Sequence, residues 1–516
     1  MNEKWNDALN EISDAYLEEA IHPQKRKVIP WPQAIAGTVA AAMLLLLLTP
    51  FSPLRMDGAA KAPESNAPAL DYPTREDSNL PPGDNTPAQP SVPVVMPLSG
   101  VIATPEYPTM APYPEVPEAY PDTPEITAWK ASLTQQYSQS KGYANNLKGF
   151  FKAAIPQFLI NPEGNAVCSP VNIYMALAML AETAGGDSRQ AVLDALNAES
   201  IDALRSQAYQ VWNAHYRADG AADTWLANSL WLNEGWGYRA DTVDTLADHY
   251  FATVFQGQFG SEEMDASLRG WLNNNTRGML NNNIQGVSLN PDDALALAST
   301  VYFSARWDGV FSPLKNTQGL FHTPAGDVET TFMNRTLAYG PYYYGEDFGA
   351  VRLDFDDAGA RGYGAMWLIL PDEGYDPQDL LASGHALDMI MKPQLQQTRA
   401  EVKVHLSVPK FDVSAETDLR PGLTALGLGE LFDPAAADFS GILEHAEGVY
   451  LGGARHAARV TIDEEGVTAA AYTLMLYAGS PMPPEEEVYF TLDRPFLFVI
   501  TSRDNLPLFV GVVNEP

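Results

Sequence analysis

One stretch changes character in its middle: Ala458-Arg459-Val460-Thr461-Ile462-Asp463-Glu464-Glu465-Gly466-Val467-Thr468-Ala469-Ala470-Ala471-Tyr472-Thr473. Its first five residues read as a β-strand, and after Gly466 the side chains become small. Small, alternating side chains after a strand suit a segment that enters between two existing strands. The alternative is an alanine-rich helix followed by a proline-rich loop. Composition alone does not decide between the two interpretations.

This stretch lies in a region of globular composition that runs from about Ser140 to Pro516. Helical periodicity covers 143–158 and 171–183. Strand-like runs follow without a regular alternation of strand and helix, at 224–232, 296–303, 365–370, 402–408, 489–492, 496–501 and 508–513. The pattern therefore predicts an α+β fold with large mixed sheets.

The sequence carries none of the common catalytic motifs. It has no Gly-x-Ser-x-Gly elbow, no His-Glu-x-x-His, no phosphate loop and no dinucleotide fingerprint. Its eight histidines are scattered, with no pair at metal-ligand spacing. Cys168 is the single cysteine, which excludes a disulfide framework, and its apolar surroundings predict a buried structural thiol. A hydrolase would need a nucleophile–base motif, which the sequence lacks, and no metal site is expected.

Seven blocks between about residue 140 and the C-terminus resemble, in order, the serpin family of serine protease inhibitors. They are Asn-Ala-Val-Cys-Ser-Pro-Val-Asn-Ile at 165–173, Ala-Asn-Ser-Leu-Trp at 227–231, Ser-Thr-Val-Tyr-Phe-Ser-Ala-Arg-Trp at 299–307, Val-Pro-Lys-Phe at 408–411, Leu-Gly-Leu with Leu-Phe at 426–432, Asp-Phe-Ser-Gly at 438–441, and the two C-terminal runs 493–498 and 509–516. The resemblance implies a serpin fold with three mixed or antiparallel β-sheets, about eight or nine helices and an exposed reactive-centre loop.

The resemblance gives the opening stretch a role. The segment from His456 to Gly466 is similar to the lead-in of the reactive-centre loop, and the residues after it would form a hinge that inserts into the large sheet. The implied hinge is Glu465, Gly466, Val467, Thr468, Ala469, Ala470, Ala471, Tyr472 and Thr473. On insertion Val467, Ala469, Ala471 and Thr473 would face the core and Tyr472 would face outward. Val467 replaces the family's usual Thr, but it is uncharged and favours β structure.

The resemblance also implies a polar cluster that controls sheet opening, made of Ser169, Asn172, Ser299, Trp307 and His456. Asn172 stands where the family usually has a second Ser, and Ser299 stands where it usually has Asn. Because both side chains remain polar, hydrogen-bond partners can be exchanged. These departures bear on the rate of loop insertion and not on the fold.

The implied mechanism is suicide inhibition, in which an extracellular target serine protease forms a covalent acyl complex with the cleaved loop. The resemblance therefore implies no catalytic residue, no cofactor and no enzymatic activity for this chain. Family spacing from Gly466 places the scissile bond after Ser480, whereas counting back from Val488 favours Pro481 or Met482. The expected window is Tyr477, Ala478, Gly479, Ser480, Pro481 and Met482, with Ser480 first and Met482 second. No Lys or Arg lies in the window, which disfavours trypsin-like targets. Ala478 to Ser480 suit an elastase-like pocket, and Tyr477 or Leu476 suits a chymotrypsin- or subtilisin-like one. A non-inhibitory serpin that serves as a surface binding scaffold is the alternative.

The N-terminal part predicts a membrane anchor. Residues 28–51 carry no charge, and Lys25-Arg26-Lys27 precedes them. A helix over 32–51 would be about 30 Å long, which matches the core of a bilayer. A late signal peptide, cleaved near Ala60-Lys61-Ala62, is the alternative. The expected domains are a cytoplasmic amphipathic segment at 1–27, an anchor at 28–51, an extracellular proline-rich spacer at 52–125 and the serpin domain at 126–516. This topology predicts a single-pass protein of the cell membrane with a cytoplasmic N-terminus and an extracellular serpin domain, such as a bacterial surface protein.

Charge and composition limit the partners further. The formal net charge of -34 disfavours nucleic acid and a polyanionic cofactor. Residues 50–124 hold 18 of the 40 prolines and are expected to form an extended spacer without helix or sheet. The expected partners are one target serine protease and the membrane, and the chain is expected to be a monomer.

Overall fold

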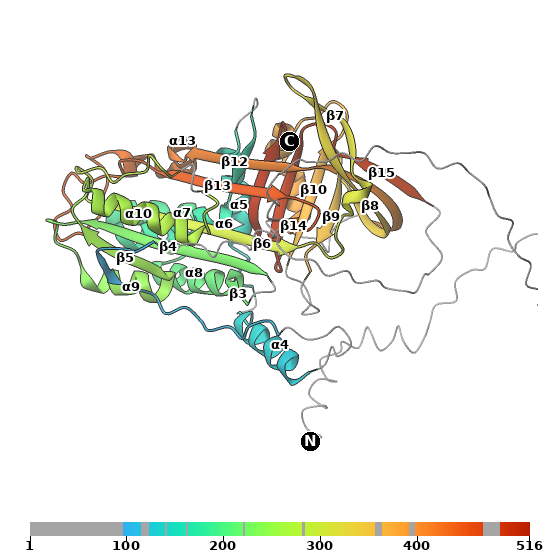
Figure 1. Cartoon of the computed structure of the whole chain (residues 1–516). Coiled ribbons are helices and arrows are strands. Elements are labelled where there is room, and N and C mark those ends of the chain that lie inside the picture. Colours follow the sequence, from blue (N-terminus) through green and yellow to red (C-terminus); the bar gives the residue numbers. More distant parts are fainter. Residues whose placement is uncertain are drawn as a thin grey trace, which may run out of the picture. The chain divides into compact units, whose positions relative to one another are not determined.

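A computed structural model describes residues 96–114, 123–139, 142–160, 164–219, 222–280, 284–356, 364–391, 398–467 and 486–516. The predicted segments at 1–27 and 28–51 lie outside these ranges, as do Thr468 to Thr473 of the predicted hinge and the scissile window from Tyr477 to Met482. Two β-sheets and the helices packed on them make up the described part (Figure 1).

The first sheet has eight strands in the order β1-β5-β4-β6-β14-β13-β12, with β3 paired to β4. All its neighbours are antiparallel except β4 and β5. The strands are β1 (Val101–Ala103), β3 (Arg217–Ala218), β4 (Asp223–Asn233), β5 (Ala252–Gly257), β6 (Leu295–Arg306), β12 (Phe411–Asp418), β13 (Arg455–Ile462) and β14 (Gly466–Val467).

The second sheet has nine strands in the order β15-β11-β8-β9-β10-β16-β17-β2, with β7 paired to β8. The 19-residue β8 pairs with β7 and β11 and, at its end, with β9. Because β8 pairs with β7 and β11 along most of its length and with β9 at its end, strands that we expected in two separate sheets belong to one. The described residues therefore form two large sheets and not the three that we predicted. The strands are β2 (Ala166–Cys168), β7 (Thr317–Thr323), β8 (Gly326–Tyr344), β9 (Phe348–Asp354), β10 (Gly364–Pro371), β11 (Thr398–Pro409), β15 (Glu487–Thr491), β16 (Phe496–Ser502) and β17 (Pro507–Val513).

Ten α-helices lie in the described residues and confirm the α+β class. They are α4 (Pro124–Gln136), α5 (Leu147–Phe158), α6 (Pro170–Thr183), α7 (Gly186–Ala195), α8 (Ile201–His215), α9 (Ala240–Tyr250), α10 (Glu262–Asn275), α11 (Pro377–Ser383), α12 (His385–Met391) and α13 (Arg420–Leu423). Short turns of other helix types are η1 (Pro313–Lys315), η3 (Thr424–Leu428) and η4 (Gly429–Phe432).

Helix α6 is the central helix of the core. Thirteen of its fourteen residues are buried, and it contacts β6 of the first sheet and β17 of the second. Pro170 occupies the first turn, where no backbone donor is needed, and Ser169 caps the helix by accepting a hydrogen bond from the Asn172 amide. An apolar helix buried on all sides fits the high content of Ala, Met and Leu in this run.

Part of the predicted spacer is folded onto the first sheet. Strand β1 pairs with the edge strand β5, and the Tyr107 ring stacks 5.4 Å from Trp212 and 5.8 Å from Tyr216. Strand β1 contains no proline, so each of its residues keeps a backbone N–H that can donate to a neighbouring strand. The prolines on either side lack that donor and cannot extend the pairing. The expectation of an extended segment without sheet structure therefore fails for Val101–Ala103.

Helix α4 attaches the next part of the chain. Trp129 is fully buried, and its indole N–H donates to Asp219 over 2.9 Å. Asp219 also accepts from the Arg217 guanidinium at 2.9 Å, and both charged side chains are buried. Because a buried charge is costly without a partner, this pair and the Trp129 indole depend on one another.

The predicted membrane location needs correction. Among the described residues no helix is both long and apolar enough to cross a bilayer, which takes about 20 residues. The longest described helix, α8, has 15 residues. The uncharged run at 28–51, on which the prediction rested, lies outside the described ranges. We therefore withdraw the single-pass topology, with its cytoplasmic N-terminus and extracellular domain.

We predict that Tyr107→Ala lowers the free energy of unfolding by roughly 2–4 kcal/mol, because it removes a ring from an aromatic cluster. Tyr107→Phe keeps the ring and is the matched control, with an expected loss below about 1 kcal/mol. Urea unfolding of the two variants beside the unchanged chain measures the difference. Equal stability of all three proteins would show that the docked segment contributes nothing to the fold.

Candidate functional site

The described start of the predicted hinge is already a strand. Gly466 pairs with Arg306 and Val467 with Ala305 on β6, and Val467 also pairs with Ile462 on β13. A Cβ at Gly466 would collide with the Ala305 carbonyl oxygen, so the close approach requires glycine. Among the described residues, β6 and β13 are joined only through the two residues of β14 (Figure 1).

A rigid turn leads into β14. The Asp463 carboxylate accepts hydrogen bonds from the amides of Glu465 and Gly466, at 2.8 and 3.1 Å. Trp307 donates its backbone N–H to the Glu465 carbonyl and its indole N–H to the Asp463 carbonyl, over 3.0 and 2.9 Å. The turn is therefore fixed on both sides, and the chain direction at Gly466 is set before the hinge begins.

Four of the five residues predicted to control sheet opening lie around the N-terminus of α6. The Ser169 amide donates to His456 Nε2 on β13 over 2.9 Å. Asn172 donates from its side-chain amide to the Ser299 carbonyl on β6 over 3.1 Å. The helix end thus makes polar contacts with both strands that flank β14.

Trp307 does not belong to this group. It lies at the end of β6, where its ring stacks 5.4 Å from Phe355 and lies 6.2 Å from Phe311. Its hydrogen bonds go to the turn before β14, so the structure places it with the hinge and not with His456.

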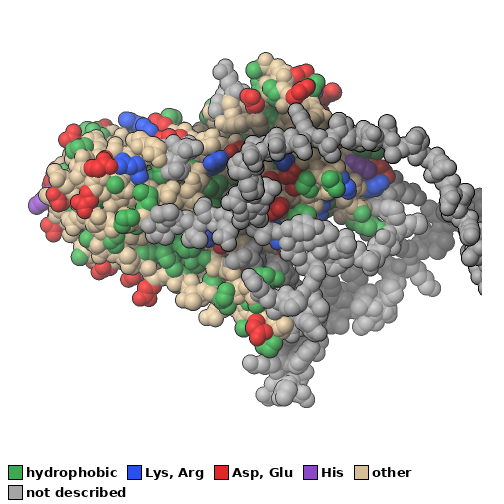
Figure 2. Space-filling model, in the orientation of Figure 1, with side chains coloured by type: hydrophobic (Ala, Val, Ile, Leu, Met, Phe, Trp, Pro, Cys, Tyr) green, Lys and Arg blue, Asp and Glu red, His purple; other side chains and the backbone are tan. Residues whose placement is uncertain are grey.

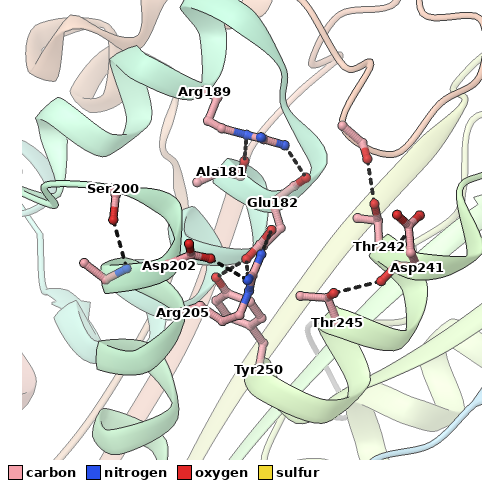
Figure 3. Close-up of polar contacts among 12 residues, drawn as sticks. Ala181, Glu182, Arg189, Ser200, Asp202, Arg205, Asp241, Thr242, Thr245 and Tyr250 are labelled. Atoms are coloured by element: carbon pink, nitrogen blue, oxygen red, sulfur yellow. Dashed lines mark hydrogen bonds and ion pairs between the residues drawn. The ribbon is translucent and has the colours of Figure 1, made fainter.

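The hydrogen-bond network extends beyond the predicted residues. Ser299 Oγ donates to Asn228 Oδ1 over 2.7 Å, and the Asn228 amide donates to the Tyr250 carbonyl over 2.7 Å. The Tyr250 hydroxyl donates to Glu182, whose carboxylate also forms a two-pronged ion pair with Arg205 at 2.8 and 3.1 Å (Figure 3). Glu182 is 4% exposed, so its charge depends on these partners.

This network connects β6, through β4 and α9, to the surface helix α8. Sequence reasoning missed Asn228, Tyr250 and Glu182. Asn228 lies in the quoted block at 227–231, so its position in a recurring segment was the available signal. Tyr250 and Glu182 carry no sequence signal, because their roles depend on how three helices meet.

Burial strongly affects His456. Desolvation lowers its pKa to about 4, and the Ser169 amide points at Nε2, so the neutral ring accepts that hydrogen bond. Protonation at Nε2 would place two N–H groups against each other inside the core. The neutral form is therefore the one that joins α6 to β13.

Cys168 is a free cysteine in this region. Cys168 is fully buried on β2, and burial raises its pKa, so the thiol is held protonated as a structural residue. In the part of the chain that the structure describes, no three His, Cys, Asp or Glu side chains gather as metal ligands would.

Comparison with known proteins gives a consistent result. The family model described as serpin (serine protease inhibitor) matches residues 151–516. Alpha-1-antitrypsin 1-3 of Mus musculus is 28% identical over 400 residues, which cover 76% of this chain and 93% of that protein. Leukocyte elastase inhibitor A of Mus musculus is 26% identical over 364 residues, covering 69% and 94%. The native state of the thermophilic serpin tengpin shares the fold, with a TM-score of 0.65, 23% identity and coverage of 73% and 95%.

We predict that stability falls between pH 6.5 and 4 because of His456. The unfolded chain, with a histidine pKa near 6.5, binds this proton before the folded chain, so acidification costs about 2 kcal/mol by pH 5. Urea unfolding at pH 7 and pH 5 measures the loss. His456→Gln is expected to be less stable at pH 7 but to lose less on acidification. The lowered pKa of buried His215 is common to both proteins. Parallel pH profiles for the two proteins would contradict the assignment.

Proposed function

The chain belongs to the serpin family, and we propose that it inhibits serine proteases as a suicide substrate. The observation that carries the proposal is β14, a two-residue strand that lies between β6 and β13 at the start of the predicted hinge. The relatives named alpha-1-antitrypsin and elastase inhibitor support an inhibitory role.

The register of β14 sets where an inserted hinge would lie. Since Val467 pairs with Ala305 and Ile462, an antiparallel continuation brings Ala469 beside Phe303 and Val460. Ala471 then lies beside Val301 and Ala458. Val467 is 2% exposed and faces the core, so by alternation Ala469 and Ala471 face it too. Small side chains at these positions would fit beside neighbouring strands whose side chains already fill the core.

The same register ends at the polar cluster. Continued by two more residues, it places Thr473 between Ser299 and His456. The hydroxyl of Thr473 can exchange hydrogen bonds with such neighbours, whereas an apolar side chain would leave them unpaired. We infer that Ser169, Asn172, Ser299 and His456 hold the sheet until the hinge reaches them, and that Trp307 fixes its point of entry.

The chemistry is supplied by the protease. Its serine oxygen attacks the carbonyl carbon of a residue in the window from Tyr477 to Met482, with Ser480 preferred. The peptide C–N bond breaks, the amine leaves with a proton, and an ester links the protease to the loop. Insertion of the freed hinge then has to precede hydrolysis of the ester by water. No side chain of the inhibitor takes part in bond cleavage, so the protein is a substrate that traps its enzyme and not an enzyme.

The loop sequence favours proteases with shallow or aromatic specificity pockets. Ala478, Gly479 and Ser480 suit an elastase-like enzyme, and Leu476 or Tyr477 suits a chymotrypsin- or subtilisin-like one. The lack of Lys and Arg in the window argues against trypsin-like targets. The proposed inhibitor acts as a monomer, without a cofactor.

We expect the full-length chain, mixed with pancreatic elastase, to form a covalent complex that resists SDS. A band at the summed mass of the two proteins, with mass analysis of the released C-terminal peptide, establishes inhibition and locates the bond. Cleavage in the window without a complex and without a rise in melting temperature would contradict the proposal. That result would favour a non-inhibitory binding scaffold.

We predict that Ala471→Asp converts the inhibitor into a substrate, because insertion would bury an unpaired carboxylate at a core-facing position. The number of inhibitor molecules consumed per protease inhibited is expected to rise roughly tenfold or more. Ala470→Asp is the matched control, since its side chain would face outward, and it is expected to stay near the unchanged chain. The ratio is measured by titrating residual protease activity. If both variants inhibit equally well, the register deduced from β14 is wrong.

A further inference from the structure

Helix α4 is attached to the rest of the fold along one side only. It lies at the lower margin of the described body in Figure 1, and Figure 2 shows acidic and hydrophobic side chains at that place. Three of its thirteen residues are buried, namely Ile126, Trp129 and Leu133. A surface helix held by so few side chains can shift without opening the apolar core.

The elements around α4 belong to the two opposite sides of β14. Strand β3 pairs with β4, β4 pairs with β6, and α8 packs on β4, so these elements belong to the β6 side. Strand β2 packs against β12 and β13, and β17 packs against β12, so these two belong to the β13 side. Helix α6 and a bridge between Trp307 and Phe355 also connect the sides. For a hinge to enter, the two sides have to move apart.

On the β6 side α4 is held by hydrogen bonds. The buried Trp129 indole donates to Asp219, the residue directly after β3, over 2.9 Å. The Gln136 side-chain amide donates to the Asn213 carbonyl on α8 over 3.0 Å. Because Asp219 is buried and also paired with Arg217, its bond to Trp129 is expensive to break.

On the β13 side the contact is made by Tyr137, the C-cap residue of α4. The exposed Arg503 guanidinium, in the turn between β16 and β17, lies over the Tyr137 ring at 5.7 Å from its centroid. Tyr137 also closes a hollow of about 10 Å³ between the two sides. Its other lining residues are Ala214, His215 and Thr224 from the β6 side, and Ser502, Arg503 and Leu508 from the β13 side.

The wall of this hollow contains a buried acceptor without a donor. His215 Nδ1 lies 2.6 Å from the Val211 carbonyl oxygen, so Nδ1 carries the proton. The buried Nε2 atom of His215 has no hydrogen-bond partner in the part of the chain that the structure describes. Burial lowers the pKa of His215, which fits a neutral ring. The two sides therefore adhere less tightly here than a fully paired interface would.

The hollow lies at the level where a hinge would first separate the strands. Thr224 pairs with Phe303 on β6, and the register of β14 brings Ala469 beside Phe303. An inserted strand widens a sheet by about 4.8 Å. This displacement is close to the 5.7 Å between Arg503 and the Tyr137 ring centroid, so α4 cannot keep both of its attachments once the hinge is in place.

We propose that α4 is a latch, which joins the two sides of β14 through Tyr137 before insertion and releases Arg503 when the hinge enters. This inference rests on the proposed inhibitory function and adds to it a control over the rate of loop insertion. The latch opposes entry of the hinge in the uncleaved protein. After release, Trp129 and Gln136 keep the helix on the β6 side.

Hydrogen exchange of the full-length chain tests the latch, before and after the loop is cut by elastase, chymotrypsin or subtilisin. Exchange of the amides at 134–137 is expected to rise about tenfold or more after insertion, because the last turn loses the packing of Tyr137. Exchange at 127–130, around Trp129, should stay the same. Unchanged exchange at 134–137 in a cleaved chain whose melting temperature has risen would overturn this inference alone.

Two variants remove the contact from its opposite ends. Tyr137→Ala and Arg503→Ala are each expected to speed insertion after cleavage about threefold or more, because the lost contact exists only before the transition state. Tryptophan fluorescence of the cleaved chain follows the insertion in time. Tyr137→Phe keeps the ring, and Thr134→Ala changes an exposed residue of the same helix. Both are controls with an expected change below about twofold.

Melting temperatures separate a latch from a merely structural contact. The two alanine variants are expected to lower the melting temperature of the uncleaved protein and to leave that of the inserted form unchanged. An equal loss in both forms, or insertion rates within about twofold of the unchanged chain, would contradict the latch. If cleavage of the unchanged chain brings no rise in melting temperature, the hinge does not insert. In that case the proposed function fails first, and the latch fails with it.

Discussion

The backbone pairing of Gly466 and Val467 is the constraint on which the arrangement of the first sheet depends. Through these two residues β6, which pairs with β4, is joined to β13, which pairs with β12. The junction is specific because Gly466 must be glycine and because Trp307 and Asp463 fix the turn before it. The pairing of β14 is only two residues long, but it sets the register that any following residues would take between β6 and β13.

Helix α6 contributes both to the apolar core and to the polar contacts that hold β6 and β13 together. Its apolar side chains pack between the sheets, while the polar residues at its N-terminus bond to β6 and to β13. The bond to β13 depends on a neutral His456, whereas the bond to β6 comes from the Asn172 side-chain amide. Both bonds can be exchanged without breaking the apolar core. At the other end of the helix, Glu182 is held by Arg205 and Tyr250, which ties α8 and α9 to the same element. Arg205 on α8, Glu182 on α6 and Tyr250 on α9 are thus joined by direct side-chain contacts.

Most of the secondary structure could be predicted from the sequence, because buried strands and α6 have strong patterns. The runs at 224–232, 296–303 and 508–513 fall within β4, β6 and β17. Three features could not be predicted. Prolines around Val101–Ala103 concealed β1. Tyr107 became structural only because four aromatic rings lie near it, from α8, β4 and the residues that directly follow α8 and α9. Trp307 was predicted to lie with His456 but contacts the turn before β14, because a motif does not show the direction of the chain at the end of a strand.

Strand β1 also determines how the sheet meets other molecules. A sheet with a free edge can pair with the same edge of another copy, which is a common start of aggregation. Here β5 is covered by only three residues, and Pro105 and Pro108 follow them and have no N–H to donate. The outer rim on this side is therefore short and poor in donors. At the β1 edge of the first sheet, a fold proposed to accept a strand in its interior therefore offers few backbone donors for adding a strand at its margin.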